Sequence, residues 1–143
     1  TPSNEGSPFS PGDLYQSTKL TAERLALGAS ETGDMEVVAI RPCSMYGPGD
    51  LRMLKMFSML SKGTFFKVGP CQENFHAVYI DDVIDGLLAA AETPNISGEV
   101  FILGGSNYLP LEDYIDTAAA AVGASKPRIR LPYWLLFSVA CLC

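Results

Sequence analysis

Asp13-Leu14-Tyr15-Gln16-Ser17-Thr18-Lys19-Leu20-Thr21-Ala22-Glu23 is the opening of a predicted helix, and it carries a tyrosine and a lysine four residues apart. Residues i and i+4 lie one above the other on a helix, so Tyr15 and Lys19 can face one point in space. A free tyrosine has a pKa of about 10, and a nearby ammonium group lowers that pKa by favouring the phenolate. The pair therefore predicts a tyrosine that exchanges a proton with a carbinol or a carbonyl. The same spacing also occurs by chance, with the tyrosine packed and the lysine in water.

Turn and cap residues set the predicted bounds of this helix. Residues 1–12 contain three prolines, two glycines and three serines, which indicates a loop. Asp13 is the predicted N-cap, Gln16 completes a capping-box pattern, and Gly33 is the predicted stop. The helix should therefore run over residues 13–32. Its apolar side is expected to consist of four leucines: Leu14, Leu20, Leu25 and Leu27.

Further along the chain, short apolar runs alternate with helical patterns. Strands are predicted over residues 36–41, 64–68, 75–80, 99–103 and 128–131. Helices are predicted over residues 51–60, from Asp81 or Asp82 to Ala91, over 110–122, and from Pro132 onward. This alternation predicts an α/β protein.

Two clusters within these elements have structural and chemical interpretations. Asp81 and Asp82 could form a carboxylate pair, but helix capping explains them better. Three methionines of the second helix are interpreted as adaptable core or pocket lining rather than as a ligand set: Met53, Met56 and Met59.

The composition limits the classes of function. The chain has 143 residues, 48% of them hydrophobic, and a formal net charge of −6, which is ordinary for one soluble globular domain. Its ten Lys and Arg residues are scattered, which argues against a nucleic-acid surface. The four cysteines form no Cys-x-x-Cys pair and the chain has a single His, so we expect no metal site and reduced thiols in a cytoplasmic protein.

The two ends of the sequence carry their own expectations. The first residues lack the basic and apolar regions of a signal peptide, and Thr1 is not Met, so we expect the sequence to begin inside a longer gene product. The stretch from Leu131 to Cys143 is apolar, but its 13 residues fall short of the roughly 20 that a membrane-spanning helix needs. We therefore expect a buried or interfacial helix there and no stable membrane span.

Three segments, in this order and at this spacing, resemble a known family. They are Tyr15-x-x-x-Lys19, the run Arg41-Pro-Cys-Ser-Met-Tyr-Gly-Pro-Gly-Asp50, and Val78-Tyr-Ile-Asp-Asp-Val83. Together they resemble the extended short-chain dehydrogenase/reductase family, the NAD-dependent epimerase/dehydratase group, over its C-terminal part only. The resemblance implies the C-terminal portion of a Rossmann-like doubly wound sheet plus a small substrate-binding α/β lobe. Residues 1–50 would hold the active-site helix and the following strand, and residues 51–143 would be mostly the substrate-side lobe with interleaved sheet elements.

The resemblance also implies roles for individual residues. Tyr15 would be the general acid/base on the substrate hydroxyl, and Lys19 would lower the pKa of Tyr15 and hydrogen-bond the ribose of NAD or NADP. The segment that follows the strand would contact the cofactor through four residues: Pro42, Cys43, Ser44 and Met45.

Several departures from the family pattern matter. A dinucleotide site needs a Gly-rich turn between a strand and a helix, and Gly104-Gly105 lacks that spacing. The family's catalytic Ser or Thr would also lie upstream of Thr1. We therefore expect this chain to carry half an active site and to be inactive alone.

Other departures concern the substrate. Ser44 stands where many relatives have a substrate-contacting asparagine. Phe75 and His76 stand where sugar-nucleotide enzymes of the family usually place an arginine for the diphosphate. His76 could still meet a phosphate, although a structural role is the simpler interpretation. Ser44, Phe75 and His76 are therefore the candidate substrate-binding residues, and they favour an apolar alcohol or ketone, as in the hydroxysteroid-dehydrogenase-like branch.

Two classes of function remain open from the sequence. The first is an NAD(P)-dependent oxidoreductase, epimerase or dehydratase that acts on a small carbinol or keto substrate and pairs as a homodimer through the helix at 13–32. The second is a non-catalytic remnant or interaction module that keeps the fold without the cofactor.

Overall fold

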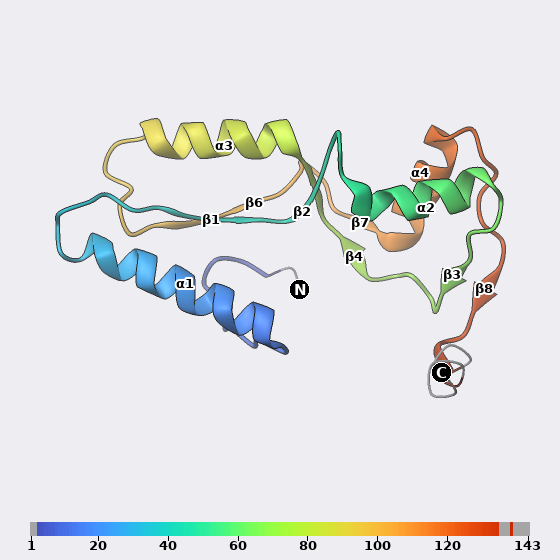
Figure 1. Cartoon of the computed structure of the whole chain (residues 1–143), viewed down its shortest axis with the longest axis horizontal. Helices are drawn as coiled ribbons and strands as arrows, with labels where there is room; N and C mark the ends of the chain where they lie inside the picture. Colours follow the sequence, from blue (N-terminus) through green and yellow to red (C-terminus); the bar gives the residue numbers. More distant parts are fainter. Residues whose placement is uncertain (1–2, 135–137, 139–143) are drawn as a thin grey trace. The chain divides into compact units, whose positions relative to one another are not determined.

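The computed structural model describes residues 3–134 and residue 138. These residues form two compact units (Figure 1): unit 1 comprises the chain up to residue 45 and residues 78–105, and unit 2 comprises residues 46–77 and the chain from residue 106. The helices are α1 (Leu14–Ser30), α2 (Leu51–Ser61), α3 (Ile80–Glu92) and α4 (Leu111–Ala121). The strands are β1 (Ala39–Pro42), β2 (Ser44–Tyr46), β3 (Lys67–Val68), β4 (Asn74–Phe75), β5 (Ala77–Tyr79), β6 (Val100–Leu103), β7 (Leu109–Pro110) and β8 (Arg130–Leu131).

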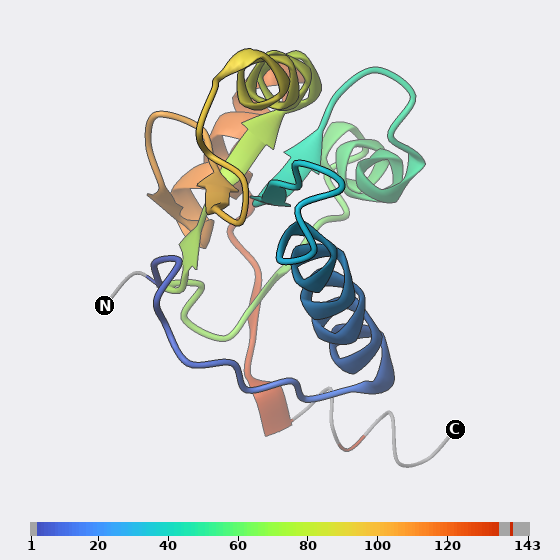
Figure 2. The ribbon, with the colours of Figure 1, turned by 90° about the vertical axis from the view of Figure 1, so that its left-hand side faces the viewer.

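Unit 1 is a layered α/β arrangement around two parallel strands. β1 pairs with β6 in the register Ala39 with Val100 through Pro42 with Leu103. α1 lies on one face of this pair and α3 on the other (Figures 1 and 2). A strand covered on both faces explains why residues 37–40 form a continuous apolar run rather than an alternating one.

The N-terminus of α1 differs in one detail from the prediction. Asp13 is the N-cap as predicted, and its Oδ1 accepts a hydrogen bond of 2.7 Å from the Gln16 backbone N–H. The Gln16 side chain, however, accepts from the Gly12 backbone N–H at 2.8 Å, one residue before the position that a capping box uses.

The leucines of α1 occupy two faces rather than one apolar side. Leu20 and Leu27 are seven residues apart, which is two turns, and both are half-buried. Leu14 and Leu25 are eleven residues apart, which is three turns, and they are 79% and 73% exposed. The prediction that all four leucines share one packed side is therefore wrong, because it counted apolar residues without resolving their angular positions.

The start of α3 corrects another prediction. Asp81 and Asp82 were expected to cap this helix, but the N-cap is Tyr79, which makes no side-chain cap hydrogen bond. Both aspartates lie in the first turn instead, where a carboxylate favours the positive end of the helix dipole. The strand predicted over 75–80 is likewise divided into β4 and β5, and Ile80 already belongs to α3.

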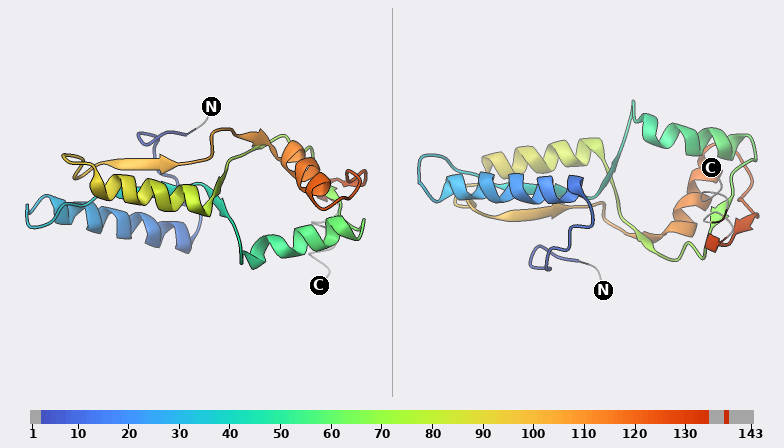
Figure 3. Two further views of the ribbon diagram at one scale, coloured as in Figure 1. Left: turned by 90° about the horizontal axis from the view of Figure 1, so that it is seen from above. Right: turned by 60° about the horizontal axis from the view of Figure 1, so that its bottom comes forward.

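Unit 2 is built on the packing of α2 against α4 (Figure 3). Met56 and Phe57 pack against its core, which agrees with the core interpretation for Met56. β3 pairs with β8 in parallel, and β4 pairs with β7 in antiparallel orientation. The buried residues of this core are Leu60, Cys71, Ile115, Ala118 and Ala119.

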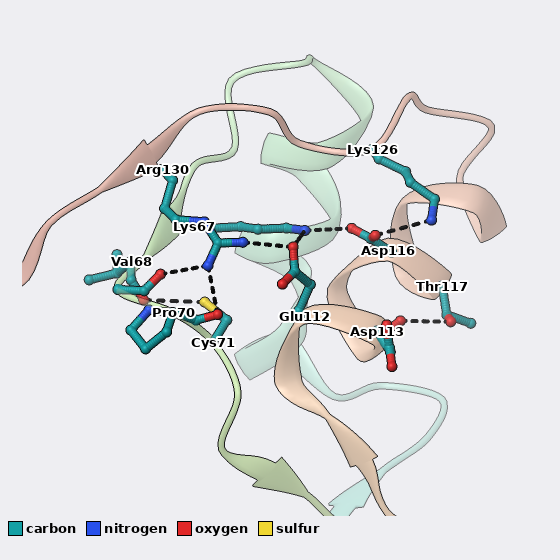
Figure 4. A network of polar contacts seen from close by, with 11 residues as sticks. Lys67, Val68, Pro70, Cys71, Glu112, Asp113, Asp116, Thr117, Lys126 and Arg130 are labelled. Carbon is teal, nitrogen blue, oxygen red and sulfur yellow. Dashed lines mark hydrogen bonds and ion pairs between the residues drawn. The ribbon is translucent and has the colours of Figure 1, made fainter.

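A buried lysine ties β3 to α4 (Figure 4). Lys67 is 4% exposed, and its Nζ lies 2.8 Å from both Glu112 Oε1 and Asp116 Oδ1. Arg130 of β8 donates to the same Glu112 oxygen at 2.7 Å, and Lys126 lies 3.2 Å from Asp116 Oδ2. Both carboxylates are therefore shared between two cations, which joins α4 to the chain on either side of it.

The C-terminal prediction is only partly covered by the structure. The helix expected from Pro132 onward falls largely outside the described residues. Among the residues that are described, no helix combines the length and the apolar character needed to cross a membrane.

Candidate active site

Tyr15 and Lys19 lie together near the N-terminus of α1, and both are exposed. The Lys19 Nζ is 5.6 Å from the centroid of the Tyr15 ring, within the range of a cation–π contact. Tyr15 is 68% exposed, so its hydroxyl is open to a ligand or to solvent. The geometry agrees with the predicted i, i+4 arrangement, and the catalytic role of the pair stays a prediction.

The predicted cofactor-contact segment lies at the same end of unit 1. α1 and β1 run in opposite directions, so the first turn of α1 and the last residue of β1 are at the same end (Figure 1). In this segment Pro42 and Ser44 are exposed, whereas Cys43 and Met45 are half-buried. The Cys43 backbone N–H donates to the Leu103 carbonyl at 2.7 Å, and burial raises the pKa of the Cys43 thiol. Cys43 is therefore kept in the protonated form and is a poor nucleophile.

Sequence reasoning missed an ion pair that links this segment to α1. Arg41 Nε lies 2.8 Å from Glu23 Oε2, and Arg41 Nη2 lies 2.6 Å from Glu23 Oε1. The spacing of Glu23, four residues after Lys19, was the available signal. Nothing in the local sequence identified Arg41 as its partner, because the two residues are 18 positions apart.

The predicted substrate residues Phe75 and His76 belong to unit 2, whereas Tyr15, Lys19 and residues 42–45 belong to unit 1. The Phe75 ring is tilted against Tyr114 with centroids 4.4 Å apart, and His76 meets Tyr108 edge-on at 6.2 Å. Burial raises the pKa of Tyr114, and the nearby Tyr46 and Asp50 add to that effect. Sequence reasoning missed Tyr108 and Tyr114, because both lie more than 30 residues from their partners.

Residues 1–104 match the sequence model of the NAD dependent epimerase/dehydratase family. The chain belongs to this family. The match includes α1 with Tyr15 and Lys19, both strands of the parallel pair and α3. The family that the motifs predicted is confirmed.

Individual relatives agree with this assignment. The chain is 26% identical over 126 residues to a UDP-glucose 4-epimerase from Vibrio cholerae, covering 87% of this chain and 38% of that protein. It is also 26% identical over 132 residues to a sterol-4-alpha-carboxylate 3-dehydrogenase, decarboxylating, from Bos taurus, covering 87% of this chain and 37% of that protein. The chain therefore spans less than half the length of these relatives.

A solved structure confirms the fold class. The chain is 28% identical to the UDP-glucuronic acid 4-epimerase from Bacillus cereus in complex with NAD, with a TM-score of 0.77. The similarity covers 90% of this chain and 44% of that protein. The predicted fold, the C-terminal portion of a Rossmann-like α/β protein, is therefore correct.

Proposed function

We propose that the full-length protein to which this chain belongs is an NAD- or NADP-dependent oxidoreductase, epimerase or dehydratase acting on a carbinol or keto substrate. The observation that carries this proposal is the exposed pair of Tyr15 and Lys19 on α1, within the part of the chain that matches the family. A bound nicotinamide would accept or supply the hydride in this reaction.

The residues of unit 1 suit the nicotinamide end of such a cofactor. A phenol and an ammonium group on one helix face offer donors to ribose hydroxyls. Lys19 would hold the ribose, and Tyr15 would take the proton from the substrate hydroxyl or return it to the carbonyl. Pro42, Cys43, Ser44 and Met45 would border the cofactor beside them.

The remaining parts of the site are proposed to come from outside this sequence. The chain contains no Gly-x-Gly-x-x-Gly turn, which a dinucleotide diphosphate requires. The matched part is 38% of the length of one relative and 37% of the length of another. We therefore infer that the 143-residue chain is inactive by itself and that the full-length protein supplies the phosphate-binding turn.

The substrate class is argued from unit 2. One similar relative is named for a nucleotide sugar and another for a sterol, at equal identity, so the names do not decide between them. Phe75 and His76 stand against tyrosine rings and offer no guanidinium to a diphosphate. These contacts favour an apolar alcohol or ketone over a nucleotide sugar, with Ser44 as a further substrate contact.

Two more predictions accompany this function. Pairing of two copies through the helix at 13–32 is supported by the exposed Leu14 and Leu25, which lie on one face of α1. A cytoplasmic location is supported by the acidic composition and by cysteines without a disulfide-like pattern.

Replacing Tyr15 tests the central step. In the full-length protein, Tyr15→Phe should reduce turnover by roughly 100-fold or more while cofactor affinity changes little, because only the transferable proton is lost. Tyr133→Phe removes a hydroxyl from an exposed tyrosine in unit 2 and should leave turnover unchanged. Wild-type rates in Tyr15→Phe would contradict the acid/base role.

A further inference from the structure

One guanidinium group in unit 1 binds both α1 and the segment that precedes it. Arg41, in β1, makes the two hydrogen bonds to the Glu23 carboxylate of 2.8 and 2.6 Å. Both side chains are largely buried, with 24% of Arg41 and 17% of Glu23 exposed. The hydrogen bonds from Arg41 lower the pKa of Glu23, so its carboxylate remains ionised in the pair.

The same guanidinium group also holds the segment before α1. Its Nη1 donates to the Glu5 carbonyl at 3.3 Å, and its carbon lies 4.8 Å from the centroid of the Phe9 ring. The Glu5 carboxylate in turn accepts from the Ile102 backbone N–H of β6 at 2.9 Å. The segment that leads into the candidate catalytic helix is thus fixed to both strands of the parallel pair.

The position of Glu23 makes this pair relevant to Tyr15 and Lys19. Tyr15, Lys19 and Glu23 follow one another at intervals of four residues and therefore form one row along α1. Arg41 immediately precedes Pro42, where the candidate cofactor segment begins. A shift of α1 along its axis by one residue would move the row by about 1.5 Å relative to that segment.

We propose that Arg41 is a positioning residue that fixes the register of α1 against β1 and so places Tyr15 and Lys19 beside the carboxyl end of β1. This inference rests on the proposed function and goes beyond it, because it assigns the placement of the acid/base pair to a residue that touches neither substrate nor cofactor.

The two parallel hydrogen bonds explain why the residue is arginine. A planar guanidinium group fixes both the distance and the direction of a carboxylate, whereas a lysine ammonium is a single point charge that allows the helix to slide and rotate. Replacement of Arg41 by lysine therefore keeps the positive charge but no longer fixes the register of α1 against β1.

The test is Arg41→Lys in the full-length protein, with Arg52→Lys as the matched control. Arg52 makes two hydrogen bonds of 2.9 Å to the Asp50 carboxylate, but in unit 2 and with 71% of its side chain exposed. Arg41→Lys should lower kcat by about 10- to 100-fold, because a displacement of about 1 Å misaligns the reacting groups. Tyr15→Phe should abolish one limb of the pH–rate profile, and in Arg41→Lys that limb should lie at another pH. Arg52→Lys should change neither kcat nor the pH–rate profile.

Hydrogen exchange supplies a readout that is independent of turnover. The Ile102 amide should exchange faster in Arg41→Lys, because Glu5 is then held less firmly. Glu23→Gln breaks the same pair from the other side and should reproduce both effects. The double variant Arg41→Lys with Glu23→Gln should lower kcat little further than either single variant, because each of the three variants removes the same interaction.

The outcomes separate the two proposals. Unchanged kcat and an unchanged pH profile in Arg41→Lys, with an active wild type, would overturn the positioning role alone, whether or not Ile102 exchanges faster. A wild-type protein that neither turns over nor binds NAD or NADP would overturn the proposed function and the positioning role with it.

Discussion

Lys19 has two proposed tasks, ribose binding and support of Tyr15, and each has its own measurement. In the full-length protein, Lys19→Ala should weaken cofactor binding and also reduce turnover, because the ribose contact and the ammonium group beside the Tyr15 ring are lost together. The loss of a hydrogen bond to a charged group corresponds to about 10- to 100-fold in affinity. Calorimetric titration with NAD or NADP and steady-state rates measure the two effects, with Lys55→Ala, on the exposed side of α2, as the control. Unchanged cofactor affinity in Lys19→Ala would remove the ribose role.

For individual residues, the sequence predicted contacts between residues close in the chain and missed contacts between residues far apart in the chain. Tyr15 and Lys19 were predictable, because helix geometry alone brings i and i+4 together. Arg41 and Glu23 were not, because their contact depends on the packing of α1 against β1. Leu14 and Leu25 were misplaced for another reason, because their angular positions on the helix differ from those of Leu20 and Leu27.

The packing of α3 against β6 depends on a glycine. A Cβ atom at Gly86 would come within 2.5 Å of Leu103 Cδ1, so Leu103 would have to move. Gly86→Ala should therefore destabilise the protein by about 1–3 kcal/mol through overpacking. Gly28, inside α1, has no atom within 4 Å of such a Cβ, and Gly28→Ala should stabilise by roughly 0.5–1 kcal/mol through helix propensity. Urea unfolding of both variants measures the difference, and equal effects would contradict the close approach of α3 and β6.

The charge network of unit 2 makes a prediction about pH. Hydrogen bonds from Lys67 lower the pKa values of Asp116 and Glu112. The pairing therefore stabilises the folded state fully at pH values above the carboxyl pKa values of the unfolded chain. This stabilisation is lost as the pH falls through the lowered pKa values of the folded protein. Burial opposes the charge on Lys67, yet its two carboxylate partners raise its pKa overall, so its contribution is lost only in strongly alkaline solution. We expect the free energy of unfolding to decrease below about pH 4.

Lys67→Met tests this network directly. Removing Lys67 takes the shared buried cation from both carboxylates and should destabilise the protein at neutral pH, by less than the roughly 3–5 kcal/mol of a buried charge left unpaired, because Arg130 and Lys126 remain. Glu112 then keeps only Arg130 and Asp116 only Lys126, so the lowering of their pKa values is weaker and the variant should be less sensitive to acid than the wild type. Lys55→Met is the control with an exposed lysine. Urea unfolding followed by circular dichroism at several pH values measures both, and an unaltered acid dependence in Lys67→Met would contradict the account.

Among the elements, helices were better predicted than short strands. α1, α2, α3 and α4 begin and end within two residues of their predicted bounds, because caps and periodicity are local signals. β3 has two residues, and its partner β8 is more than 60 residues away. β7, also two residues, was not predicted at all. Such strands exist because a distant segment completes their hydrogen bonds, which no local pattern records.

For the whole molecule, the motifs predicted the family and the fold class, but the division into two units was not predictable from them. Residues 78–105 return to unit 1 because β6 pairs with β1 across about 60 positions. That return places α3 and β6 in unit 1 with β1 and leaves Phe75 and His76 in unit 2.

The central claim is that this chain carries the acid/base half of a nicotinamide-dependent enzyme. It is tested most directly by calorimetric titration of NAD and NADP into the 143-residue chain and into the same chain extended upstream to its natural start. We predict that the extended protein binds one of the two cofactors and that the 143-residue chain binds neither, because the chain contains no Gly-x-Gly-x-x-Gly turn and we propose that the full-length protein supplies it. Absence of binding to both proteins would contradict the claim and favour a non-catalytic remnant that keeps the family fold.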